Sequence, residues 1–280
     1  MKVGKIMKIN GWKYYNHAAI PSTAPHESVI MEPLINGDIW KVGGYPLLAR
    51  WHTDWDCGYK TNWWFCIRDG EFSLEKLGST QRKHVRQSLK HNTIVRTTVE
   101  ETIIDELYRI YAEATSHYTL ADNIQCKDSF VKGLLARRSK IVLFLAYDEN
   151  YELLAYMTVR PEKDWAEIET AKFGNKAMKL QSSNALYYTI LDYYLNVEKK
   201  KYISSGSRSI NHETGTQDYK ERMFGYRKAY CHLHIKYRPS ILWLITILYP
   251  FRKLLKKFDN NVKIHQMNSV LLMEELSRKE

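Results

Sequence analysis

Hydrophobic and polar positions alternate most regularly between residues 93 and 239, in periods typical of both helices and strands. Apolar residues three and four apart indicate helices over four stretches: 103–111, 128–138, 182 or 183 to 198, and 214–223. Runs rich in β-branched and aromatic residues indicate strands over six stretches: 94–99, 141–147, 153–160, 165–172, 201–204 and 229–237. The resulting order, β-α-α-β-β-β-α-β-α-β, predicts an α/β (α+β) fold with a mixed, mostly antiparallel sheet and helices on both faces.

The two ends of the chain have a different character. The first ninety residues are rich in Trp, Gly and Pro and predict an irregular β-containing region with strands at 39–42, 47–51 and 63–68. That region ends in a strongly basic helix, for which Ser79 is the expected N-cap. Past Pro239 an apolar run leads into the basic stretch 252–257, which predicts an amphipathic helical extension. We therefore expect three segments: 1–90, 91–239 and 240–280.

Composition and charge narrow the class of protein. In 280 residues, 44% hydrophobic and 13% aromatic content exclude a disordered chain and allow a sizeable core. The formal net charge of +11 suggests an anionic partner: the phosphates of a cofactor, tRNA, or an acidic membrane surface. Solubility alone is the other explanation for this charge.

The cysteines indicate whether the protein binds a metal, and the apolar runs indicate where in the cell it is expected. The four cysteines form no CxxC pair and lack zinc-type histidine spacing, so no metal site is expected. The first twenty residues lack the apolar core of a signal peptide. The longest apolar run, 241–250, is shorter than the ~20 residues that a membrane-spanning helix needs. We expect a cytoplasmic protein, either free or peripheral at the inner face of the membrane.

Two motifs support a resemblance to a known family. The order of elements over 93–239 resembles the GNAT N-acyltransferase superfamily. The stretch STQRKHVRQ at 79–87 is similar to the basic S-x-x-x-R-x-x-I-R helix of Fem-type peptidoglycan aminoacyltransferases and related GNAT-like proteins of polysaccharide clusters. The stretch DYKERMFGY at 218–226 is similar to their F-K-x-x-F-G ending, in which Gly225 suits a left-handed helix end.

The resemblance implies an N-acyltransferase with an acyl-CoA, acetyl-CoA by preference, as the donor. The acceptor would be the amino group of a cell-surface polysaccharide or peptidoglycan precursor, either a small amine-bearing molecule or a lipid-linked sugar or peptide. Acetyl-CoA-dependent members usually carry a Q/R-x-x-G-x-G/A loop, whereas the corresponding stretch here, 172–184, contains only Gly174. Basic and polar side chains at the following helix start could still bind the cofactor phosphates: Lys176, Lys179, Gln181, Ser182, Ser183 and Asn184. Alternatively, the two serines only cap the helix.

Catalytic candidates come from the strand at 165–172 and the helix at 214–223. The strand period places Glu167 and Glu169 on one face, where Glu169 by preference, or Glu167, could act as the general base. Solvated surface carboxylates are the alternative. By resemblance Tyr219 would be the acid, although Glu221 occupies the position where many acetyl-CoA-dependent members have a tyrosine. Lys220 matches the lysine of the F-K pair and could bind the donor, or it could be a surface lysine.

The loop 205–214 follows a strand end, where ligands of open sheets tend to bind. Arg208 could clamp an anionic substrate, with Glu213 beside it, and His212 could act in acid–base catalysis. A polar surface loop that caps the next helix is the alternative.

Two other functions fit the same resemblance. One is an aminoacyl-tRNA-dependent transferase of Fem type, against which the length of the chain counts, because that family usually carries two GNAT-like domains and a coiled-coil insertion. The other is a catalytically inactive GNAT-like module that binds tRNA or membrane. The acceptor and the oligomeric state stay open.

Overall fold

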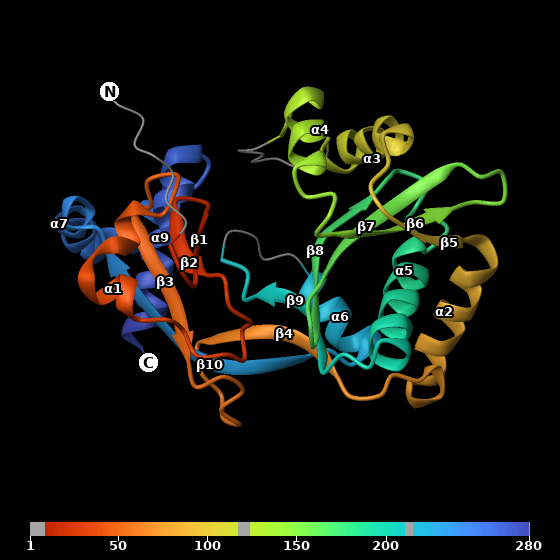
Figure 1. Cartoon of the computed structure of the whole chain (residues 1–280), viewed down its shortest axis with the longest axis horizontal. Helices are drawn as coiled ribbons and strands as arrows, with labels where there is room; N and C mark the ends of the chain where they lie inside the picture. The colour runs from red at the N-terminus through yellow and green to blue at the C-terminus, as the bar shows by residue number, and fades with distance from the viewer. Residues whose placement is uncertain (1–8, 117–123, 211–214, 280) are drawn as a thin grey trace. The chain divides into compact units, whose positions relative to one another are not determined.

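The computed structural model describes residues 9–116, 124–210 and 215–279, and these fall into two compact units (Figure 1). Unit 1 comprises Met1–Phe65, Ser207–Glu213 and Lys228–Glu280, so both ends of the chain contribute to it. Unit 2 comprises Cys66–Gly206 and Thr214–Arg227. The division into segments 1–90, 91–239 and 240–280 stays a prediction.

Unit 2 contains five of the six strands expected from the sequence over residues 93–239, and the sixth, β10 (Arg227–Tyr237), lies almost wholly in unit 1. Its strands follow the order β9-β8-β7-β6-β5 and have these bounds: β5 Thr93–Thr97, β6 Val142–Tyr147, β7 Leu153–Pro161, β8 Trp165–Phe173 and β9 Tyr202–Ser207. Neighbours pair antiparallel except β8 and β9, which are parallel. Each of the six strands predicted over residues 93–239 is confirmed within about three residues at either end.

Helices cover both faces of this sheet, as predicted (Figure 1). On one face α3 (Ile104–Thr115) and α4 (Lys127–Leu135) share a core with Leu143 and Leu145 of β6. On the other face α2 (Ser79–His91) and α5 (Ser182–Leu191) share a core with Phe144 and Ala146. Successive residues of β6 thus serve opposite cores, because side chains of a strand alternate between its faces. The fold class expected from the pattern is therefore confirmed.

Two elements after the sheet position the candidate site. Helix α5 continues as a π-helical turn, η4 (Asp192–Val197), before β9. Helix α6 (Thr216–Phe224) ends at Gly225, whose φ of 66° is left-handed, so the predicted helix stop is confirmed.

Unit 1 combines the N-terminal strands with the C-terminal helices. Its strands follow the order β1-β2-β3-β10: β1 Trp12–Tyr15, β2 Ala18–Pro21, β3 Leu48–Thr53 and β10 Arg227–Tyr237. The chain leaves the unit along β4 (Trp63–Asp69). Its helices are α1 Glu32–Asn36, α7 Pro239–Leu248, α8 Arg252–Leu255 and α9 Val262–Arg278. The 3-10 turns of the chain are η1 Asp38–Lys41, η2 Leu74–Lys76, η3 Glu101–Ile103, η5 Tyr249–Phe251 and η6 Lys256–Phe258. In the part of the chain described, no helix has the length and apolar character needed to cross a membrane.

Three local predictions are wrong. Residues 39–41 belong to the 3-10 turn η1 and Val42 is its C-cap, so the apolar Ile39 and Val42 face a core from a turn and its end and not from a strand. Gly78, not Ser79, is the N-cap of α2. Neither Ser182 nor Ser183 caps α5, because Gln181 holds the N-cap position in a left-handed conformation, with φ of 53°.

Candidate functional site

A hollow of about 260 Å³ lies in unit 2 between α2, α6 and the start of α5. Its lining includes four residues predicted from the sequence, Gln181, Ser183, Asn184 and Tyr219, together with His84, Met178 and Met223. Sequence reasoning missed the last three. His84 could have been found, since it belongs to the basic stretch 79–87, but two methionines carry no chemical signal.

A chain of hydrogen bonds joins the polar residues of this hollow. The Tyr219 hydroxyl donates to Oδ1 of Asn184 at 2.5 Å and lies 3.0 Å from Oγ of Ser183. Nδ2 of Asn184 in turn donates to Oε1 of Gln181 at 3.1 Å. Burial raises the pKa of Tyr219 to about 12, although the bond with Ser183 acts in the opposite direction. Tyr219 therefore keeps its proton near neutral pH and acts as a hydrogen-bond donor.

Lys220 is buried, with only 6% of its surface exposed. Its Nζ donates to Oγ of Ser205 in β9 and lies 5.8 Å from the ring centroid of Tyr187. Burial lowers its pKa below the ordinary range. The alternative of a surface lysine is wrong, because positions 220 and 224 of α6 share the face that turns inward.

Lys220 reaches the point where β8 and β9 stop pairing. The parallel pairing runs from Trp165 with Tyr202 to Glu167 with Ser204, and Ser205 is the next residue. Near the same point β8 has one extra residue, Glu169, because Ile168 pairs with Val159 and Thr170 with Thr158. In open sheets, ligands bind beyond the carboxyl ends of parallel strands. This end of β9 is therefore a candidate place for a reacting group.

The two predicted acidic residues contact the same arginine. Arg160 donates to Oε2 of Glu167 and, at 2.8 Å, to Oε1 of Glu169, so the two carboxylates do share a side of β8. Arg137 binds the other oxygen of Glu169 at 3.1 Å. Both carboxylates are thus held in an ion-pair network. Their use as a base stays a prediction.

The loop before α5 is closed on itself. A methyl group at Gly174 would lie 2.8 Å from Ile110 and 2.8 Å from Glu113, so this glycine permits close packing of the loop on α3. Oε2 of Glu113 also accepts from the Asn175 N–H at 2.9 Å. Six backbone N–H groups each donate to a carbonyl oxygen, namely those of Gly174, Ala177, Leu180, Gln181, Ser182 and Asn184. These groups are consequently not free to cradle a pyrophosphate.

Three other residues predicted to bind the cofactor, Lys176, Lys179 and Ser182, are not among the residues that line the hollow. Lys176 pairs with Glu152, and that carboxylate raises the pKa of the lysine. Lys179 is exposed. Ser182 is fully buried, and within the described residues its Oγ has no hydrogen-bond partner. Their role in binding a donor stays a prediction.

Arg208 lies in unit 1. Its backbone N–H donates to the Trp64 carbonyl at 2.8 Å, its guanidinium lies 4.6 Å from the Trp64 ring centroid, and its Nη1 donates to the Asn62 carbonyl at 2.6 Å. His212 and Glu213 fall outside the described residues. Among those described, no group of three or more metal-ligating side chains is close enough to hold an ion.

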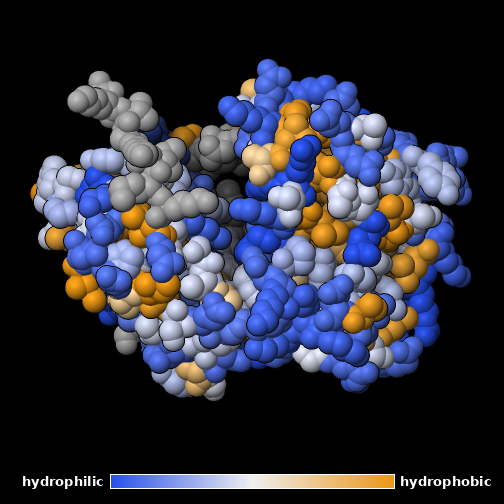
Figure 2. Space-filling view, viewed as in Figure 1, coloured by the Kyte–Doolittle hydropathy of each residue, from blue (hydrophilic) through white to orange (hydrophobic). Residues whose placement is uncertain are grey.

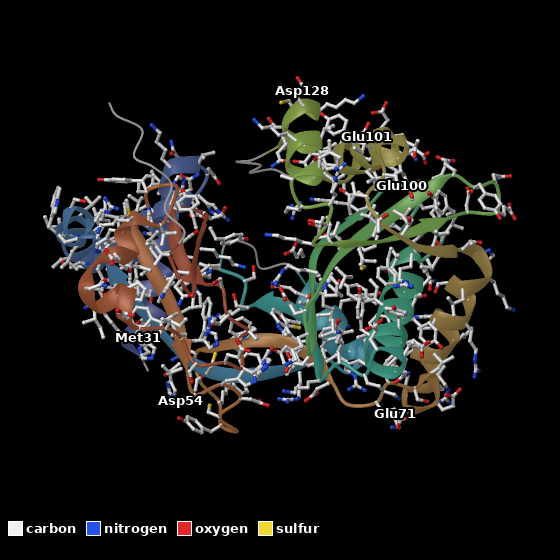
Figure 3. All side chains as sticks on the ribbon, viewed as in Figure 1. Met31, Asp54, Glu71, Glu100, Glu101 and Asp128 are labelled. Carbon is white, nitrogen blue, oxygen red and sulfur yellow. The ribbon has the colours of Figure 1, made fainter. Side chains whose placement is uncertain are left out.

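Helix α2 presents a strongly basic face. One face of α2 lines a shallow hollow of about 640 Å³ and presents Ser79, Arg82, Lys83, Arg86, Gln87, Lys90 and His91. Glu100, Glu101 and Asp128 lie at the end of unit 2 that carries α3 and α4, whereas Glu71 lies near the start of α2 (Figure 3). The basic face of α2 is thus suited to an extended polyanion.

Similarity to solved structures identifies the fold. L-PGS from Bacillus licheniformis matches with a TM-score of 0.52 and 14% identity, over 85% of this chain and 83% of that one. The C-terminal domain of a protein named as a lysylphosphatidylglycerol synthetase, from Agrobacterium fabrum, matches at 0.54 and 12%, over 85% and 84%. FemX matches at 0.54 and 8%, over 84% and 85%. No family model and no curated protein sequence matches the chain.

The chain therefore has a GNAT-like mixed α/β fold, of the kind found in FemX and L-PGS. The matches cover most of each chain and therefore extend beyond residues 93–239. Unit 1 is built by residues from both ends of the chain and not by the first ninety alone.

Proposed function

We propose that this protein is an aminoacyl-tRNA-dependent transferase, and not an acetyl-CoA-dependent one. The observation that carries the proposal is the closed loop before α5. Seven N–H groups between Gly174 and Asn184 already donate within the protein and Glu113 lies against the loop, so a pyrophosphate would meet mainly occupied donors and a negative charge. The likeness in fold to FemX, together with the F-K-like pair Tyr219-Lys220, supports the same donor.

Transfer from an aminoacyl ester requires an acceptor nucleophile to attack the ester carbonyl. The bond from the carbonyl carbon to the ribose oxygen then breaks, and that oxygen takes up the proton lost by the nucleophile. We assign Lys220 to the oxygen on which negative charge develops. Its ammonium is buried beside Ser205, where a charge-assisted hydrogen bond is stronger than in water. Tyr219, which keeps its proton, would hold the polar wall of the adjacent hollow through Ser183 and Asn184.

The basic face of α2 supplies the electrostatic attraction that an RNA donor needs. Lys83, Arg86 and Lys90 recur at helical spacing along the shallow hollow. Phosphate contacts of this kind make affinity fall steeply with salt. The proposal therefore includes salt-sensitive binding of tRNA, which the double substitution K83E/R86E would weaken.

The test compares the two donors directly. The purified protein is incubated with bulk tRNA charged with labelled amino acids or with labelled acetyl-CoA, and with lipid and soluble precursor fractions of a bacterial lysate as acceptors. We expect label to pass from aminoacyl-tRNA, and K220M to lower the rate at least ~100-fold. The matched control K140M replaces an exposed lysine of unit 2 and should stay within twofold of wild type. Transfer from acetyl-CoA alone would overturn the proposal, and tRNA binding without transfer from either donor would favour an inactive binding module.

A further inference from the structure

The segment from Pro239 to Val262 is held in unit 1 by one side only. Ile241, Ile245 and Leu248 of α7, and Leu255 of α8, pack into a core with Tyr237, Leu271 and Met273. The spacing of the three α7 residues defines a single inward stripe. Tyr249 of η5 packs against the same core, and the exposed side chains of the segment face away from it.

The outward side is unusually apolar for a surface. Six large hydrophobic residues are more than half exposed: Leu242 (51%), Trp243 (60%), Ile247 (55%), Phe251 (56%), Leu254 (52%) and Phe258 (56%). They follow one another at intervals of one to four residues through α7, η5, α8 and η6. Figure 2 also shows hydrophobic residues on the surface of unit 1. Such a concentration of exposed apolar side chains marks a surface that meets another phase or molecule.

Lysines accompany these apolar residues. Lys253, Lys256 and Lys257 are exposed, as is Lys263 directly after the segment. The acidic residue in this stretch, Asp259, is engaged by His265 at 2.9 Å and by Asn268 at 2.7 Å. The outward side of the segment is therefore both apolar and positively charged.

We propose that residues 239–262 dock in the plane of an anionic lipid bilayer, with the six exposed apolar side chains at the boundary of headgroups and acyl chains. Interfacial helices combine Trp, Phe and Leu with Lys in this way. The cores of protein–protein interfaces are instead depleted in lysine, which argues against a second protein as the occupant. Each lysine near an anionic surface adds about a fivefold gain in binding, so four of them reinforce the apolar contact.

This inference does not rest on the identity of the acyl donor. It bears on the acceptor, because a protein lying on a bilayer is positioned to reach a nucleophile attached to a lipid. Failure of one proposal would leave the other standing, since vesicle binding and transfer of label are measured separately.

The test is co-sedimentation of the full chain with vesicles of phosphatidylcholine alone or mixed 3:1 with phosphatidylglycerol. We expect binding to the mixed vesicles that weakens in 0.5 M NaCl, and a loss of at least ~10-fold in W243S/F251S and in K253E/K256E/K257E. The matched control I35S changes a side chain of unit 1 that is 79% exposed, and it should bind as wild type does. Unchanged melting temperatures would show that the variants are folded.

Two outcomes would overturn the inference. The first is wild-type binding by W243S/F251S. The second is no vesicle binding by wild type together with a concentration-dependent dimer that W243S/F251S abolishes, which would assign the surface to a second copy of this chain.

Discussion

Nζ of Lys220 donates a hydrogen bond to Oγ of Ser205, one residue beyond the last pairing of β8 with β9. The contact brings a cation to the place where two parallel strands part. It joins α6 to β9 across residues that are 15 positions apart in sequence. Because the lysine is buried there, its charge is costly for folding, and that cost suggests a use in function.

Replacing Lys220 by methionine separates its roles in folding and in transfer. We expect K220M to be at least as stable as wild type, because a buried ammonium is replaced by an apolar chain of similar size. Burial lowers the pKa of Lys220 in the folded state, so the unfolded state binds its proton more tightly. Wild-type stability should therefore rise with pH between the folded pKa and about 10.5, relative to K220M.

Urea unfolding at pH 8 and pH 9.5 measures this effect, with K140M as the exposed control. Other titrating groups are common to wild type and K220M and cancel in the comparison. A K220M protein that is destabilised by more than ~2 kcal/mol at both pH values would contradict the prediction.

Removing the Tyr219 hydroxyl should cost stability. Y219F leaves Oδ1 of Asn184 without the donor that lies at 2.5 Å, and a buried acceptor that loses its partner costs ~1–2 kcal/mol. The free energy of unfolding from urea titration measures the loss. Y151F removes the hydroxyl of a side chain that is 76% exposed, and it should change stability by less than ~0.5 kcal/mol. Equal effects of the two substitutions would refute the assigned hydrogen bond.

Replacing two glycines of unit 2 by alanine should change the stability of the protein in opposite directions. G174A places a methyl group 2.8 Å from Ile110 and 3.0 Å from the Leu154 carbonyl, and we expect a loss of ~1–3 kcal/mol from overpacking. Gly133 lies in α4 with no atom within 4 Å of the added carbon. G133A should therefore gain up to ~1 kcal/mol from helix propensity. Thermal and urea unfolding of both variants check this, and a G174A protein as stable as wild type would disprove the close packing.

Unit 1 should lose stability in mild acid through His52. Burial, the largest cause, lowers the pKa of His52, and nearby His234 and Arg50 act in the same direction against the 2.7 Å bond to the Pro25 carbonyl. The unfolded state therefore takes up the proton first. The contribution of His52 to stability is complete above about pH 6.5 and is lost as pH falls below it.

The substitution H52Q can keep a donor for the Pro25 carbonyl without a titrating group. We expect its melting temperature to fall less than that of wild type between pH 7.5 and pH 5.5. H91Q changes an exposed histidine of α2 and serves as the control. A wild-type pH response in H52Q would exclude this explanation.

The order of elements in unit 2 could be predicted because each has a strong local signal. Strands β6 and β7 are apolar on both faces, and α3 has one apolar stripe. Gly225 marked the end of α6 because few residues tolerate its φ. The strand predicted at 39–42 was wrong, because Ile39 and Val42 face a core from a 3-10 turn and its C-cap, and this gives the same short apolar pattern as a strand.

The site was only partly predictable. Four residues of the hollow, Gln181, Ser183, Asn184 and Tyr219, were expected from the family resemblance, yet as cofactor ligands and an acid and not as one hydrogen-bonded chain. Their mutual contacts join α5 to α6, and pairs that far apart leave no periodic trace in one sequence.

By itself the sequence determined the GNAT-like succession of strands and helices, because burial of alternating and helical stripes is a local requirement. Only the tertiary structure decided that Lys220 is buried beside Ser205, that Gly174 serves packing, and that both ends of the chain build one unit. Each of these depends on which segments meet in space. Such contacts join residues that are distant along the chain, and hydrophobic periodicity carries no information about them.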